Sequence, residues 1–244
     1  MAVIHRTTMT PGKLELLASW LPAQPWNPGG GHEPRLTKAG GFRLDDPQGE
    51  VGIEFMAVTD ESGDRPITYQ VPLSYRGAPL PGADHALIGT SEHGVLGRRW
   101  IYDGTHDPVL VGQLFALILG EAEPQAQGVS NAPAPSVTAH FAEAGHTASI
   151  SSVDVTNGPD GTDLRVLTAS APGAPSGPAR ELTIRVNRVL RPERPERPER
   201  AESATRAAQA LGHITADWLL PDGATTRGLY AVVSDTAPNS ANTP

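Results

Sequence analysis

Residues 86–120 read ALIGTSEHGVLGRRWIYDGTHDPVLVGQLFALILG, and this stretch holds the clearest strand and the clearest helix of the chain. Residues 95–102 (VLGRRWIY) have the β-branched and aromatic character of a strand. Asp107 and Pro108 then indicate a helix start, because an aspartate carboxylate caps free N–H groups and proline needs no N–H at the first helical position. The residues that follow are apolar on most sides of the helix until Gly120, which can take the left-handed conformation that ends it. We therefore expect a core strand beside a deeply buried helix.

Arg98 and Arg99 are neighbours in the predicted strand. Together they could bind an anion, and they are candidate binding residues for that reason. The alternative is that they point to opposite faces, as strand neighbours do, and pair with separate Asp or Glu side chains.

Short strands separated by turn residues account for most of the remaining chain. The strands that we expect lie at 2–8, 41–44, 51–59, 67–75, 137–141, 149–155, 164–169, 181–190, 214–220 and 228–233, and two further helices lie at 10–22 and 201–211. Successive strands joined by short turns pair in the antiparallel sense. The pattern predicts an α+β fold in which an antiparallel sheet packs on helices.

Composition divides the chain into parts. Residues 121–135 (EAEPQAQGVSNAPAP) have the composition of a linker, which separates a first domain, 1–120, from a β-rich domain, 136–235. Residues 191–200 read RPERPERPER, and proline at every third position excludes a regular helix and favours an extended polyproline-like segment. This segment is a solvated spacer or a docking strap for a partner. Residues 236–244 have the composition of a disordered tail.

Charge and composition narrow the classes of function. The formal net charge of −8 argues against a general nucleic-acid binder, which needs clustered basic residues, and the lack of cysteine excludes disulfides and zinc–thiolate sites. The N-terminus lacks an apolar signal region, and no run approaches the roughly 18 apolar residues of a membrane span. We expect a cytoplasmic protein with no membrane contact.

The sequence lacks the common catalytic motifs. A P-loop, a dinucleotide-binding loop, an H-x-D catalytic loop, HExxH and GxSxG are all absent. We therefore assign no catalytic residue, no metal ligand and no cofactor. Trp20 lies near the end of the first predicted helix and Trp26 follows that helix. The two residues are either core anchors or a platform on which a sugar ring could stack.

Three segments resemble the opening of actinobacterial maltokinases and their N-terminal cap-like relatives. These are residues 17–26 (LASWLPAQPW), 69–75 (YQVPLSY) and 101–108 (IYDGTHDP), and the resemblance covers about residues 1–120. Residues 182–192 (LTIRVNRVLRP) are similar to the kinase small-lobe strand that carries the ATP-anchoring lysine, with Arg185 in the place of that lysine. The resemblance implies a cystatin-like cap followed by a small-lobe-like portion, without the large lobe that would hold a catalytic base and metal ligands.

The resemblance implies a setting in trehalose, maltose and α-glucan (glycogen) metabolism. Our first hypothesis is a stand-alone, non-catalytic cap-like protein that assists or regulates a maltokinase, a trehalose synthase or a glucan-branching enzyme. The second is a degenerate sugar- or nucleotide-binding module, in which Trp20, Trp26 and Arg185 would bind an α-glucan, maltose or a nucleotide. The third is an enzyme, either a kinase completed in trans or a glucan-acting enzyme.

Overall fold

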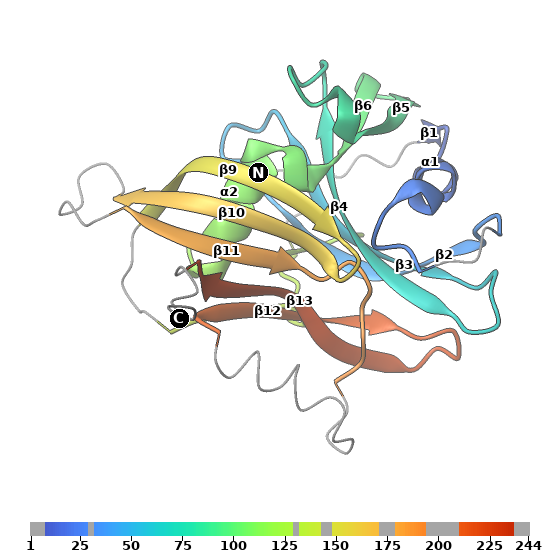
Figure 1. Cartoon of the computed structure of the whole chain (residues 1–244). Helices are drawn as coiled ribbons and strands as arrows, with labels where there is room; N and C mark the ends of the chain where they lie inside the picture. The colour runs from blue at the N-terminus through green and yellow to red at the C-terminus, as the bar shows by residue number, and fades with distance from the viewer. Residues whose placement is uncertain are drawn as a thin grey trace, which may run out of the picture.

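The structure, a computed structural model, describes residues 8–28, 32–128, 132–142, 148–170, 179–193 and 210–236 (Figure 1). In chain order the elements are β1 (Met9–Thr10), α1 (Lys13–Trp20), η1 (Leu21–Ala23), β2 (Leu36–Leu44), β3 (Gly52–Asp60), β4 (Ile67–Arg76), η2 (Asp84–Ala86), β5 (Leu87–His93), β6 (Gly97–Asp103), η3 (Gly104–His106), α2 (Pro108–Ile118), β7 (Gln125–Ala126), β8 (Thr138–Phe141), β9 (Ala148–Gly158), β10 (Gly161–Ser170), β11 (Arg180–Val186), β12 (Gly212–Leu219) and β13 (Thr225–Asp235).

In the described ranges, the strands form one 13-stranded antiparallel sheet. Its order is β1-β5-β6-β4-β3-β2-β12-β13-β11-β10-β9, with β7 added to β2 and β8 added to β12. The expected α+β class, a cystatin-like cap on helices followed by a small-lobe-like portion, is therefore wrong, because the described chain is mostly antiparallel β-sheet. Residue patterns identified the individual strands, but they do not reveal that strands from both ends of the chain share one sheet.

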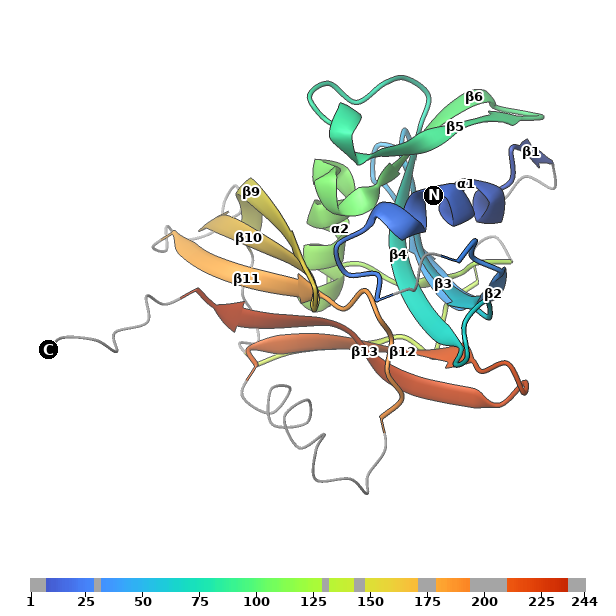
Figure 2. The ribbon, with the colours of Figure 1, turned by 45° about the vertical axis from the view of Figure 1, so that its right-hand side comes forward.

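Helix α2 lies inside the curve of this sheet, between β3 and β4 on one side and β9 to β11 on the other (Figure 2). Asp107 caps it by accepting the N–H of Val109, Pro108 occupies its first turn, and Gly120 follows it with φ of +78°. Its buried side chains join those of strands β2, β3, β10, β11, β12 and β13 in one core. The predicted start, end and deep burial of this helix are confirmed.

Strands β3 and β4 are buried on both faces, unlike most antiparallel strands. Phe55 and Ile53 of β3 face the core around α2, whereas Met56 and Val58 of the same strand pack with Leu17 of α1. The two helices thus cover opposite faces of the same pair of strands, and α1 is the shorter and more exposed cover.

Strand β2, from the first half of the chain, joins strand β12, from the second half, through a glycine. Gly40 of β2 pairs with Trp218 of β12, at a bulge in β2 that follows Lys38. A Cβ on Gly41 would overlap the carbonyl oxygen of Phe55, and Gly41 has a φ of +125°. Only glycine fits this close approach of β2 to β3.

Several predicted elements differ from the structure. The strand expected at 181–190 ends at Val186, because Asn187 donates its side-chain amide to the carbonyl of Leu229 and the chain then leaves β13. Strand β5 was not predicted, since its polar and half-exposed residues lack a clear apolar face. The predicted helix at 201–211, residues 194–200 of the predicted strap and residues 237–244 of the predicted tail lie outside the described residues, apart from the last two positions of that helix, as does most of the strand expected at 2–8.

We expect Gly41→Ala to lower the free energy of unfolding by about 2 kcal/mol or more, because the methyl group meets backbone at a strained φ. Gly112 is the matched control: it lies in α2, and a Cβ there meets nothing within 4 Å. Gly112→Ala should raise stability by about 0.5–1 kcal/mol, since alanine is the better helix former. Urea unfolding followed by tryptophan fluorescence measures both, and a Gly41→Ala variant as stable as the native chain would contradict the close approach.

Candidate functional site

The two candidate tryptophans lie together at the end of α1. Their ring centroids are 5.7 Å apart, and Trp26 stands 5.9 Å from the ring of Tyr69. Trp26 is only 1% exposed and belongs to the core under α1, whereas Trp20 is half-buried. The packing interpretation fits Trp26, because a buried ring offers no face on which a sugar could stack, whereas the role of the half-buried Trp20 stays a prediction.

Arg98 and Arg99 lie on β6, in its hairpin with β5. Arg98 forms an exposed ion pair with its cross-strand partner Glu92, with Nε 2.8 Å from Oε1. Arg99 instead donates from Nη2 to the carbonyl oxygen of Leu96. The two guanidinium groups therefore have separate partners, and an exposed pair of this kind adds little stability.

Arg185 lies on β11 and forms a bidentate ion pair with Asp163, its cross-strand neighbour on β10. Its Nε and Nη2 atoms are 2.7 and 2.6 Å from the two carboxylate oxygens. Hydrogen bonding to Asp163 raises the pKa of Arg185 above its ordinary value. Of the five candidate binding residues, the structure thus brings together only the two tryptophans.

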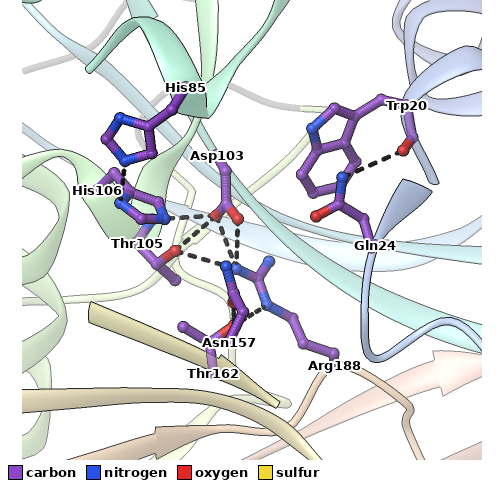
Figure 3. A network of polar contacts seen from close by, with 9 residues as sticks. All are labelled: Trp20, Gln24, His85, Asp103, Thr105, His106, Asn157, Thr162 and Arg188. Carbon is purple, nitrogen blue, oxygen red and sulfur yellow. Dashed lines mark hydrogen bonds and ion pairs between the residues drawn. The ribbon is translucent and has the colours of Figure 1, made fainter. Parts of the chain in front are cut away.

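A different arginine, Arg188, occupies the interior of the molecule. It is 0% exposed, and its Nη2 atom lies 2.6 and 2.8 Å from the two carboxylate oxygens of Asp103 at the end of β6 (Figure 3). The same nitrogen donates to the hydroxyl of Thr105, and Nε donates to that of Thr162 on β10. The hydroxyl of Thr162 donates in turn to Asn157.

The segment that carries Arg188 also bridges the two ends of the chain through its backbone. The carbonyl of Arg188 accepts the N–H of Gln70 on β4, and Leu190 donates its N–H to the carbonyl of Thr68. The ring of Trp26 covers the guanidinium, with its centroid 5.0 Å from Cζ. The side chain of Arg188 and the backbone of residues 188–190 therefore connect the C-terminal strands to β4, β6 and the loop after α1.

Two histidines lie next to this buried network. His85 Nε2 is 3.1 Å from His106 Nδ1, and the two rings meet edge to face (Figure 3). Burial lowers the pKa of His106 below its ordinary value, and this effect exceeds the opposing effect of the Asp103 carboxylate. Asp103 and Thr105 are buried and already hydrogen-bonded to Arg188. The side chains left to meet a ligand here are therefore the two imidazoles, one of which donates a hydrogen bond to the other.

The histidines open onto a groove of about 790 Å³. One wall consists of the loop at 80–85 and one side of α2, and the other wall is residues 149–155 of β9. The groove is the candidate functional site, because it adjoins the buried network and its rim carries hydroxyl, imidazole and carboxylate groups. In the described part of the chain, no three His, Cys, Asp or Glu side chains come close enough together to hold a metal ion.

Residues 20–107 match the family model described as the maltokinase N-terminal cap domain. These residues form a maltokinase cap-like region. The match confirms the resemblance seen in the sequence, and it covers less than half of the chain. No curated protein matches the chain.

The cap-like region supplies only part of the site. It contributes His85, Asp103, Thr105 and His106, whereas Arg188, Thr162 and the β9 wall come from residues beyond it. The groove thus lies where the cap-like region meets the later strands. None of the helices in the described ranges has the length and apolar character that crossing a membrane requires.

Sequence reasoning missed both parts of this site. For Arg188 a signal existed, since Val186, Arg188 and Leu190 alternate and the outer two are apolar, so the arginine shares the core-facing side of its segment. His85 and His106 lie in separate short turns, and no local pattern indicates that they meet.

We expect Arg188→Met and Asp103→Leu each to lower the free energy of unfolding by about 3–5 kcal/mol, because each leaves an unpaired charge in the interior. The double variant has no buried charge and should lose clearly less than the sum of the two single losses. Urea unfolding of all three variants measures this coupling, and strictly additive losses would contradict the ion pair.

We also expect stability to fall as the pH drops from about 7.5 to 5.5. The folded pKa values of His106 and His213 are lowered by burial, so the unfolded chain, with ordinary values near about 6.5, binds more protons in this window. His106→Gln should flatten the plot of melting temperature against pH. An unchanged slope for His106→Gln would show that this histidine titrates alike in both states.

Proposed function

We propose that the protein is a non-catalytic accessory or regulatory partner of enzymes of α-glucan, maltose and trehalose metabolism. The cap-like region at residues 20–107 supports a maltokinase-related setting. The partners that we propose are a maltokinase, a trehalose synthase or a glucan-branching enzyme, and the setting is the cytoplasm.

The observation that carries this proposal is the bidentate ion pair of Arg185 with Asp163. In the resemblance, this residue takes the place of a lysine that anchors a nucleotide phosphate, but both Nε and Nη2 are committed to Asp163. A planar guanidinium held on two sides by a carboxylate is a poor substitute for a mobile ammonium group. Arg188, which lies close by in the chain, serves instead to join β4 and β6 to β10. These arginines support a binding scaffold better than a phosphoryl-transfer site.

The groove favours a second candidate function, a sugar- or nucleotide-binding module. Ser149 and Ser152 line one wall and His85 and His106 lie at the other, so hydroxyl and imidazole groups line the same hollow. Such groups suit the hydroxyls of a maltose or an α-glucan. An aromatic platform for a sugar is not at this place, since Trp20 ends α1, Trp26 packs in the core beside it, and neither lines the groove.

We expect the purified full chain to bind one of three purified enzymes from the same host: the maltokinase, the trehalose synthase or the glucan-branching enzyme. Biolayer interferometry measures binding, and the kcat and KM of each enzyme with and without an excess of this protein measure regulation. Failure to bind any of the three, with all rates unchanged, would contradict the accessory role.

A thermal-shift series separates this role from the second candidate. Millimolar maltose, trehalose, maltodextrin or Mg-ATP should leave the melting temperature of the isolated protein unchanged, because a ligand that binds the folded state must stabilise it. A rise with one of them would support the small-ligand module instead. Turnover of labelled ATP or of an iodine-stained glucan by the chain with its partner would support the third hypothesis, an enzyme.

A further inference from the structure

One wall of the groove is made of consecutive strand residues. All seven positions of 149–155 line it. Side chains of a strand alternate between two faces, so a hollow that touches only one face would meet every second residue. A wall of consecutive residues means that the groove runs along the backbone edge of β9.

This edge is the end of the sheet. β9 pairs with β10 on one side, and in the described sheet no strand follows it on the other side. An edge strand presents unpaired N–H and C=O groups, which are the groups that another strand can pair with. The groove therefore offers backbone hydrogen bonds as well as side chains.

A bulge limits where such pairing can be regular. Ile150 pairs with Thr168 and Ser152 pairs with Leu167, which leaves Ser151 as the extra residue of β9. From Ser152 onwards the register is continuous to the end of the strand. Within the groove, regular pairing can thus take place along residues 152–155.

The opposite wall is one stripe of α2. Pro108, Val111, Gly112, Phe115 and Ala116 line the groove with the three- and four-residue spacing of one helix face, and the polar Gln113 lines it beside them. Gly112 leaves this wall open, because a Cβ there would meet nothing within 4 Å. A segment lying between β9 and α2 would therefore have a backbone edge on one side and an apolar surface on the other.

The charges at the groove are acidic. Its carboxylates are Glu121 and Asp154, both on exposed residues, and its basic groups are the two histidines, of which burial disfavours the charged form of His106. The whole chain carries a formal net charge of −8. Charge complementarity thus favours a positively charged occupant over a second copy of this acidic chain.

We propose that the groove binds an extended, basic segment of a partner protein, which adds as a strand to residues 152–155 of β9. Its backbone pairs with the β9 edge, alternate apolar side chains face Pro108 and Ala116, and Lys or Arg side chains pair with Glu121 and Asp154. This inference rests on the proposed accessory function, for which it supplies the docking surface.

The test uses a phage-displayed library of random heptapeptides, selected on the immobilised full chain. We expect enrichment of sequences that alternate β-branched with basic residues, and the best sequence, made as a synthetic peptide, should bind more weakly at higher salt. Hydrogen exchange of the complex should show slower exchange within residues 152–155. No enrichment, or enrichment of acidic sequences, would overturn the proposal.

Two matched controls separate strand addition from other binding. Gly112→Trp fills the open wall and should weaken the selected peptide at least tenfold, whereas Gly112→Ala should bind it with nearly native affinity. A peptide with N-methyl groups on alternate residues, in the register that faces β9, should also lose at least tenfold. Equal binding by the methylated peptide would overturn strand addition. So would a stable dimer of this chain in sedimentation equilibrium that the selected peptide cannot dissociate, because a second copy would then occupy the β9 edge.

The Gly112→Trp variant also distinguishes a failure of this docking surface from a failure of the proposed accessory function. If a partner enzyme binds the native chain and Gly112→Trp equally well, the function stands and the docking surface lies elsewhere. If no enzyme binds although the basic peptide does, the groove is correct and the assignment to α-glucan enzymes fails.

Discussion

Arg188 carries its charge in the interior, where an unpaired ion would cost several kcal/mol. Asp103 balances that charge with both oxygens, two threonine hydroxyls bond to the same guanidinium, and the Trp26 ring covers it. Nη1 has no hydrogen-bond partner among the described residues. We expect the pair to contribute specificity more than net stability, because its charge is balanced only when β6, β10 and the loop after α1 all lie in their native places.

The ion pair also determines where the groove can form. Asp103 is followed at once by η3, which carries Thr105 and His106, and by the cap of α2. Thr162 is the second residue of β10, next to the turn that follows β9. Fixing Asp103 against Thr162 therefore sets the helix wall and the strand wall at a constant separation, with the two histidines at one end.

The sequence was sufficient for elements whose signals are local. The N-cap at Asp107, the glycine after α2 and the apolar character of that helix all act within a few residues, and the structure confirms them. The pairing of Gly40 with Trp218 and the meeting of His85 with His106 depend on the whole chain, so patterns of local residues could not predict them. The α+β interpretation failed for the same reason, since strand patterns leave open which strands share a sheet.

A preformed groove lowers the cost of binding. An extended segment that adds to an edge must lose its own backbone freedom, and any wall that also had to become ordered would add to that loss. Here β9 is held by β10, and α2 is capped and buried, so both walls are ordered before a partner arrives. The structural use of Arg188 and the binding use of the groove are then two consequences of one arrangement: the contact that joins the cap-like region to the later strands also builds the surface between them.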